Sequence, residues 1–234
     1  VRSEIGAKVL GKSYNIPGTY FVQENGIDGV CAQACLKMSL IHVDGENDTR
    51  LPPTCGKIND IVAKARGIQK RKDFRPLDGL TITDILNVIR EEHAHPLLLD
   101  TQSDPKTLPY EWAYLLIESG IPTLVAFCSD VDDIDSEEEP EIFHVMPIVG
   151  HTLNGDKWLP IAQLLYDELD SDIDRTTHRY RSTVEWACHL VVHDDVLGPY
   201  YCMSNYDLLY PPCPGRGRKT RIRYVVGVVP DDAG

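Results

Sequence analysis

The order of hydrophobic patterns along the chain is the feature that most constrains its fold. Apolar residues recur at helical spacing in the first half, whereas short continuous apolar runs typical of buried strands follow Pro122. Runs of helices followed by runs of strands are typical of α+β proteins. The sequence therefore predicts an α+β fold, in which an N-terminal helical part packs on a C-terminal antiparallel sheet.

Three stretches before Pro122 have the pattern of helices. The first is Asp28–Val43, where small and apolar residues recur at helical spacing. The second follows Thr81 or Thr83, either of which can serve as an N-cap. Its apolar stripe consists of Ile82, Ile85, Leu86 and Ile89. The third is Pro109–Ser119, which Gly120 is expected to end as a C-cap.

Four later stretches have the pattern of strands. Each is an apolar run bounded by polar or turn-forming residues, and the runs are Thr123–Phe127, Phe143–Gly150, Trp186–His193 and Arg221–Val229. Between the second and third strands, Leu159–Leu169 is helix-like and leads into an Asp-rich segment. Because there is no internal repeat and no linker long enough to separate domains, residues 1–234 are expected to form a single domain.

The charge of the chain argues against two classes of partner. It has 23 Lys and Arg residues against 36 Asp and Glu residues, a net charge of −13. Nucleic acid and anionic membrane surfaces are therefore not expected as partners. The longest apolar runs also fall well short of the roughly 20 residues that a membrane-spanning helix needs.

The cysteines bear on the compartment and on metal binding. There are seven, an odd number at irregular spacings, and the N-terminus has no secretion signal. This predicts reduced thiols in a cytoplasmic protein. A structural zinc site is disfavoured because no C-x-x-C pair occurs. The sequence thus predicts no metal and no cofactor.

Cys31 begins the uninterrupted part of the first predicted helix, a position that suits a nucleophilic thiol. The unpaired N–H groups and the dipole at a helix N-terminus favour negative charge, and so they favour the reactive thiolate. Cys35 lies one turn deeper and is expected to point into the core. For Cys31 taken alone, a small buried core residue is the commoner explanation, so the interpretation depends on its partners.

A cysteine nucleophile needs a base, which usually comes from a distant part of the sequence. His144 opens a predicted strand beside an acidic loop, where it is well placed to meet a helix N-terminus. A third group must orient the imidazole and fix its tautomer. Asp194 or Asp195, at the end of the next predicted strand, can accept a hydrogen bond from His144. Either acid can also be explained as a turn former.

An attack on a carbonyl also requires donors for the oxyanion. The backbone N–H of Cys31 at the helix start is one candidate, and the side-chain amide of Gln23, upstream of a glycine-containing loop, is the other. Such a donor typically contributes about 3 kcal/mol to transition-state stabilisation. Gln33 is closer to Cys31 in sequence, but it lies within the helix and is expected to face solvent.

In this order, the elements resemble those of the C39-like, papain-fold cysteine peptidases. The family's nucleophile helix is similar to the stretch from Gln23 to Met38, in which a small residue and a second cysteine follow Cys31. Three further segments match in order. The helix, Gly, Pro and strand ahead of the catalytic His resemble Leu115–Val125, the His strand resembles Phe143–Gly150, and the strand before the third triad member resembles Val191–Gly198.

The resemblance implies a papain-like fold and a triad of Cys31, His144 and Asp194, since the family's Asp directly follows its strand. Asp195 stays the alternative third member, and Gln23 would donate to the oxyanion. The implied reaction is cleavage of a peptide, isopeptide or related amide bond in a peptide or protein substrate, through a covalent thioester. An acyltransferase or transpeptidase would use the same residues with an amine as acceptor.

Two alternatives come from other classes of protein. The chain could be a papain-fold binding module without activity, which a separation above about 6 Å between Cys31 and His144 would favour. It could also be a zinc-dependent protein that uses His144, His193 and Asp194, and metal analysis of the purified protein addresses this.

Overall fold

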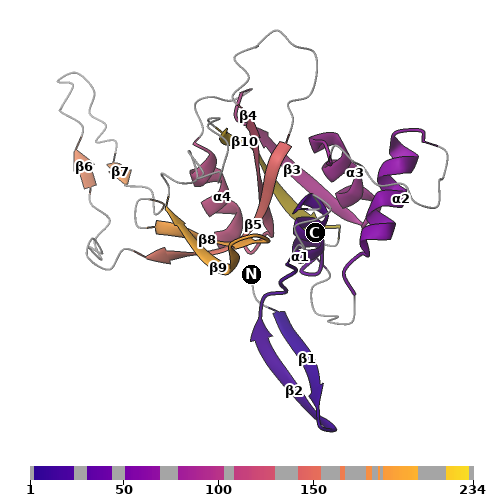
Figure 1. Cartoon of the computed structure of the whole chain (residues 1–234). Helices are drawn as coiled ribbons and strands as arrows, with labels where there is room; N and C mark the ends of the chain where they lie inside the picture. Colours follow the sequence, from indigo (N-terminus) through magenta and orange to yellow (C-terminus); the bar gives the residue numbers. More distant parts are fainter. Residues whose placement is uncertain are drawn as a thin grey trace.

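The chain folds around one large antiparallel sheet. The structure is a computed structural model that describes residues 3–23, 31–43, 51–68, 79–102, 108–129, 142–153, 164–166, 178–180, 184, 187–204 and 220–231. Six strands in these segments form the sheet seen in Figure 1, and every neighbouring pair in it is antiparallel. In spatial order they are β3 (Ala94–Asp100), β10 (Thr220–Pro230), β4 (Thr123–Ser129), β5 (Ile142–Leu153), β8 (Ala187–Asp194) and β9 (Gly198–Ser204).

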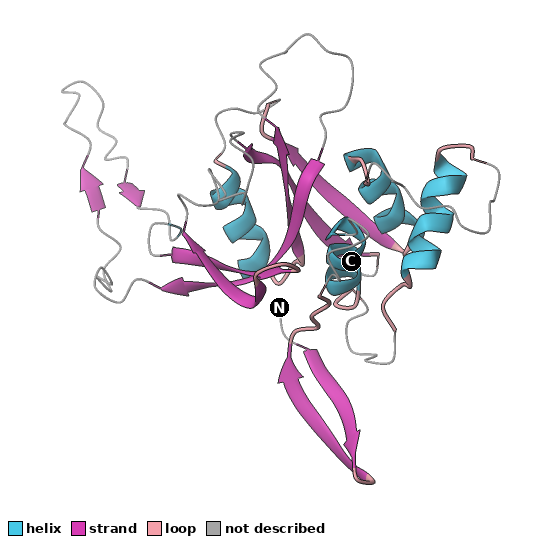
Figure 2. Cartoon of the chain, in the orientation of Figure 1, coloured by secondary structure: helices cyan, strands magenta, loops and turns pink. Residues whose placement is uncertain are grey.

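Helices cover both faces of the sheet. Three of them, α1 (Cys31–Leu40), α2 (Cys55–Ala65) and α3 (Ile82–Glu91), lie on one side, and α4 (Pro109–Glu118) lies on the other (Figure 2). The predicted α+β class is therefore confirmed, with helices packed on an antiparallel sheet. None of the helices in the described segments has both the length and the hydropathy needed to cross a membrane.

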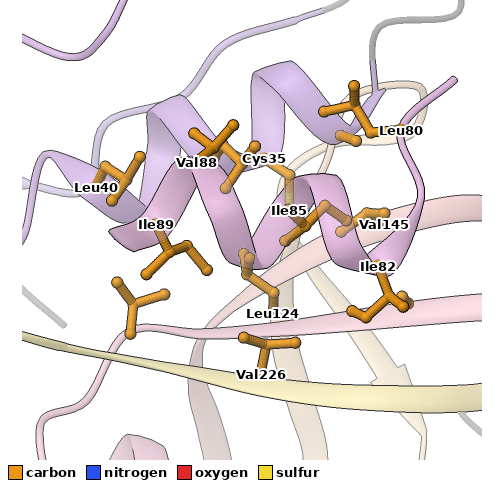
Figure 3. Packing of buried hydrophobic residues seen from close by; sticks show 14 of the residues in the cluster. Cys35, Leu40, Leu80, Ile82, Ile85, Val88, Ile89, Leu124, Val145 and Val226 are labelled. Atoms are coloured by element: carbon orange, nitrogen blue, oxygen red, sulfur yellow. The ribbon is translucent and has the colours of Figure 1, made fainter. Parts of the chain in front are cut away.

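Alternation along the strands gives each face its own core. In β4, Leu124 and Ala126 belong to the core under α1, α2 and α3, whereas Val125 and Phe127 belong to the core under α4. Figure 3 shows the first core, in which buried side chains of α1 and α3 meet those of β4, β5 and β10. Cys35 is fully buried there, so its predicted inward orientation is confirmed.

The register of β5 and β8 explains how distant residues meet. Ile148 of β5 lies opposite Val192 of β8, and the two strands run antiparallel. The start of β5, with His144, therefore lies beside the end of β8, with Asp194. This pairing places the imidazole of His144 and the carboxylates of Asp194 and Asp195 at the same end of the β5–β8 pair.

Two small hairpins complete the described structure. The first pairs β1 (Ser3–Val9) with β2 (Lys12–Gly18) and projects away from the main sheet in Figure 1. The second pairs β6 (Leu164–Tyr166) with β7 (His178–Tyr180). The helix-like prediction for Leu159–Leu169 is thus wrong at Leu164–Tyr166, because a short apolar run fits a strand as well as a helix. The rest of that stretch lies outside the described residues.

Several predicted boundaries agree closely with the structure. Thr81 is the N-cap of α3, and Gly120 follows α4 in the left-handed conformation with φ 75°. The first predicted helix is described from Cys31 onward, and its residues 28–30 lie outside the described segments. The strand predicted from Trp186 is described from Ala187. The single domain expected over residues 1–234 stays a prediction.

Asp84 ties α2 to α3 and is expected to matter for stability. Its buried carboxylate contacts Nη2 of Arg66 at 2.5 Å and accepts the backbone N–H of Thr81 at 2.9 Å. We expect Asp84→Ala to lower the free energy of unfolding by about 2–3 kcal/mol, because both a helix cap and a partly buried ion pair are lost. Urea denaturation measures this loss.

Glu91 provides a matched control for the Asp84 substitution. It also lies in α3 and pairs with a lysine of α2, Lys64, at 3.3 Å, but both side chains are largely exposed. Glu91→Ala should therefore cost less than about 1 kcal/mol. Equal losses for the two variants would contradict the importance of the buried cap.

Candidate active site

His144 and Asp194 form the centre of the candidate site. The Nε2 atom of His144 lies 2.9 Å from Oδ2 of Asp194. The histidine side chain is 24% exposed, and the aspartate side chain is 5% exposed. A charged hydrogen bond in such a sheltered position holds the imidazole in one orientation.

The other oxygen of Asp194 is held by the turn that follows β8. Oδ1 accepts the backbone N–H of Val196 at 2.8 Å and that of Leu197 at 2.6 Å. Burial opposes ionisation, but the hydrogen bonds from His144, Leu197 and Val196 outweigh it and lower the pKa of Asp194. The carboxylate is therefore fixed in position and stays ionised.

Cys31 approaches the same imidazole from the start of α1. It is the first residue of that helix, it is partly buried, and it lies close enough to His144 to raise the pKa of the imidazole. Because Nε2 of the imidazole is engaged by Asp194, Nδ1 is the ring nitrogen that remains for the thiol. Helix α1, β5 and β8 together align a thiol, an imidazole and a carboxylate.

The protonation of His144 follows from its two neighbours. Burial alone would lower its pKa, but hydrogen bonds to Asp194 and Cys31, together with their charges, raise the pKa of His144 to about 10. The imidazole is consequently protonated at neutral pH. A positive charge beside a cysteine is an environment that favours a reactive thiol.

The two buried cysteines of the core, Cys35 and Cys128, lie in surroundings that disfavour the thiolate. Burial, followed by the charges of Cys31, Asp195 and Asp194, raises the pKa of Cys35 well above its usual value. Burial also raises the pKa of Cys128 to about 12. These thiols therefore stay protonated, and the expectation that Cys35 is a poor nucleophile is supported.

Asp195 lies beside the pair of His144 and Asp194 without making the short contact that Asp194 makes. Its Oδ1 atom is 3.6 Å from Nε2 of His144, beyond the range of a normal hydrogen bond, and its side chain is buried. Of the two acids that the sequence offers, Asp194 makes the direct contact.

Metal binding was one alternative, and the described residues contain one group with suitable donors. His144, Asp194 and Asp195 bring their ligand atoms within 4.8 Å of one another. The predicted ligand His193 is not in this group, which corrects the predicted zinc set. Its Nε2 atom lies 2.9 Å from Oγ1 of Thr19, because neighbouring residues on a strand point to opposite faces.

The two glutamines differ from each other in their surroundings. Gln23 has an exposed side chain, and residues 24–30 between it and α1 lie outside the described segments. Its role in an oxyanion hole stays a prediction. Gln33 was expected to face solvent, and this is wrong: it is 2% exposed and donates to Oδ1 of Asn59 at 3.4 Å. Helix α2, to which Asn59 belongs, covers that face of α1.

Sequence reasoning missed the donors that hold Asp194. The N–H groups of Val196 and Leu197 belong to the backbone, so they cannot be recognised from the residue types in the sequence. A usable indication was present, since Asp at the start of a turn commonly accepts N–H groups two and three residues later.

No protein-family model matches the chain, and no curated protein matches it either.

Proposed function

We propose that this protein is a papain-like cysteine hydrolase that cleaves a peptide, isopeptide or related amide bond. The observation that carries the proposal is the alignment of three groups on three elements. Cys31 at the start of α1 lies close enough to His144 to raise the pKa of the imidazole, and Nε2 of His144 lies 2.9 Å from Oδ2 of Asp194. The packing of α1 on an antiparallel sheet supports the papain-like fold and the likeness to C39-like peptidases.

The reaction begins with the Cys31 thiolate and the His144 imidazolium. The sulfur attacks the substrate carbonyl, and the tetrahedral intermediate collapses to a thioester as His144 gives its proton to the leaving amine. His144 then takes a proton from water as the water oxygen attacks the thioester, which releases the carboxylic acid and regenerates the Cys31 thiolate beside the His144 imidazolium. Asp194 keeps the imidazole oriented and stabilises its positive charge through both steps.

The developing oxyanion requires donors near the start of α1. The backbone N–H of Cys31 is suited to this role because the first N–H groups of a helix have no partner within it. Gln23 is proposed as the second donor. In the same scheme an amine acceptor instead of water would make the protein an acyltransferase or transpeptidase.

A cytoplasmic location belongs to the same proposal. The six cysteines in the described part of the chain are all free thiols. Reduced thiols are the rule in the cytosol and the exception in oxidising compartments. A peptide or protein is the proposed substrate, because an amide bond is the target for which this combination of groups is suited.

The reaction can be tested by trapping the acyl-enzyme. The protein is incubated with a panel of fluorogenic peptides and quenched in acid, and intact-mass spectrometry then measures any acyl adduct. We expect turnover together with an adduct on Cys31, and loss of both in Cys31→Ala. Cys188→Ala, which removes another partly buried thiol, is the control and should retain both. Turnover that survives in Cys31→Ala would contradict the proposal.

A further inference from the structure

The end of β8 and the start of β9 do not pair as a regular ladder. Val192 lies opposite Tyr201, and the next pair joins Asp194 to Gly198. One residue of β8 therefore faces two residues of β9. Such a β-bulge bends a strand and is common beside active sites, where it changes the direction of a side chain. The carboxylate that holds His144 thus comes directly after an interruption of the hydrogen-bonded ladder.

Tyr200, in this bulge, has a backbone conformation that is unusual for its residue type. Its φ is 56°, in the left-handed region that residues with a side chain rarely adopt. A backbone of this kind costs free energy and persists only where the surrounding contacts determine it. The contacts of Tyr200 therefore show what holds the bulge in place.

One threonine of the N-terminal part joins the two sides of the bulge. Oγ1 of Thr19 lies 2.9 Å from Nε2 of His193, and it donates to the Tyr200 hydroxyl at 2.9 Å. The backbone N–H of Thr19 donates to the same hydroxyl at 3.3 Å. His193 is fully buried, and the rings of Tyr200 and Phe21 meet it in T-shaped contacts. We call Thr19, His193 and Tyr200 the bulge clamp.

The bulge clamp lies next to the turn that fixes Asp194. His193 immediately precedes Asp194, and Tyr200 follows Gly198, the partner of Asp194, by two residues. Within the turn, Oδ1 of Asp194 accepts the N–H groups of Val196 and Leu197, while Oδ2 contacts His144. A clamp that joins the two strands at this turn therefore fixes the position of the carboxylate.

The bulge clamp acts through position rather than through charge. Burial is the largest influence on His193, and it lowers the pKa of the imidazole. The ring is consequently neutral at neutral pH. The effect of the clamp on His144 is thus expected to pass through the contact of 2.9 Å between His144 and Asp194.

We propose that Thr19, His193 and Tyr200 are positioning residues for Asp194, so that the segment after β2 takes part in aligning the imidazole of His144. This inference rests on the proposed function, because the alignment contributes to catalysis only if His144 acts together with Cys31. The three residues act through Asp194 and not on the substrate itself.

The test removes one hydroxyl of the bulge clamp at a time. Thr19→Val keeps the shape of the side chain and the backbone N–H, and Thr19→Ser keeps the hydroxyl. Tyr200→Phe removes the other hydroxyl and keeps the ring. The matched control is Thr152→Val, because Oγ1 of Thr152 lies 3.3 Å from Nδ1 of His189, another histidine of β8.

Two measurements are made on the whole chain and on each variant. Steady-state kinetics on the best peptide of the panel gives kcat and KM. NMR titration of protein labelled with ¹³C and ¹⁵N in its histidines gives the pKa of His144, whose signals are assigned by their loss in His144→Ala. The second measurement reports the contact between His144 and Asp194 whether or not a substrate is turned over.

We expect Thr19→Val to lower kcat about tenfold and to leave KM within about twofold, because a misaligned imidazole weakens transition-state stabilisation more than substrate binding. The pKa of His144 should fall by about half a unit to one unit, since a weaker contact with Asp194 leaves burial less opposed. Thr19→Ser should restore both values, and Thr152→Val should change neither.

Tyr200→Phe provides a second route to the same result. It should lower kcat and the pKa of His144 in the same direction as Thr19→Val. Because the two hydroxyls share one hydrogen bond, the double variant should lose little more than Thr19→Val alone. Fully additive losses would contradict a single clamp.

Two different failures can be distinguished. If Thr19→Val leaves kcat and the pKa of His144 unchanged, or if Thr152→Val changes them equally, the bulge clamp does not position Asp194. The proposed function then stands, provided that turnover of the unmodified protein requires Cys31. If the unmodified protein has no turnover that requires Cys31, the proposed function fails and the role of the clamp in catalysis is overturned with it.

Discussion

Replacing His144 with alanine is expected to lower kcat/KM for amide cleavage by about a thousandfold to ten-thousandfold. General acid and base catalysis by a positioned side chain typically contributes about a hundredfold to ten-thousandfold. In the proposed mechanism His144 also supplies a positive charge beside the attacking sulfur, so its loss removes two effects at once. Steady-state kinetics on the best peptide of the panel measures the change.

The same strand offers a matched control for this substitution. His151 lies further along β5, and its Nε2 atom also contacts a carboxylate, Oε1 of Glu118, at 2.7 Å. Its partner belongs to α4, on the other face of the sheet from α1. His151→Ala should therefore keep kcat/KM within about threefold of the unmodified protein. Activity of His144→Ala within tenfold of that value would contradict the role of His144 as acid and base.

Asp194→Asn is expected to move the alkaline limit of activity to lower pH. The pKa of His144 is about 10, because hydrogen bonds and charges from Asp194 and Cys31 outweigh the opposing effect of burial. Removing the Asp194 charge leaves that burial less opposed, and the pKa should fall by about 1 to 3 units. The imidazolium then loses its proton at a lower pH. The variant should lose activity between pH 7 and 9, a range in which the unmodified protein stays active.

Asp195→Asn is the control that separates the two acids. It removes the same charge from a buried neighbour, but that carboxylate is 3.6 Å from Nε2 of His144 and makes no short hydrogen bond to it. We expect a clearly smaller shift of the alkaline limit. A larger shift in Asp195→Asn than in Asp194→Asn would show that the orienting role belongs to Asp195.

The elements that the sequence predicted well have strong local determinants. Helix α3 combines an apolar stripe with the cap at Thr81, whose side chain accepts the Asp84 N–H. Helix α4 is bounded by Pro109 and by the positive φ of Gly120. Local chemistry of this kind survives packing because the signals that start and stop the helix act within one turn.

The elements that the sequence missed depend on contacts between distant segments. Strand β3 contains Pro96, which is unusual in a strand interior, but β3 lies at the edge of the sheet, where proline is tolerated. The surroundings of Gln33 depend on α2 covering α1, and α2 itself was not predicted. The local sequence pattern around Gln33 does not show which residues of another helix will pack against it.

The candidate site falls between these cases. His144 and the acids at 194 and 195 could be proposed because each ends or begins a predicted strand. The choice between Asp194 and Asp195 required the geometry around Nε2 of His144, since both carboxylates approach that atom and only their distances, 2.9 Å and 3.6 Å, separate them. The backbone donors at Val196 and Leu197 became visible only with the turn.

Cys31 and His144 are proposed to form a thiolate–imidazolium pair, and the pH dependence of alkylation is a direct test of this pair. Labelling of Cys31 and Cys55 by iodoacetamide is followed from pH 5 to pH 10 in one sample. Both thiols begin helices and are partly buried, so a difference between them reports the imidazole. We predict that Cys31 is labelled at pH 6 at least about a hundredfold faster than Cys55, and that His144→Ala abolishes this difference. Equal rates for the two cysteines across the pH range would contradict the pair.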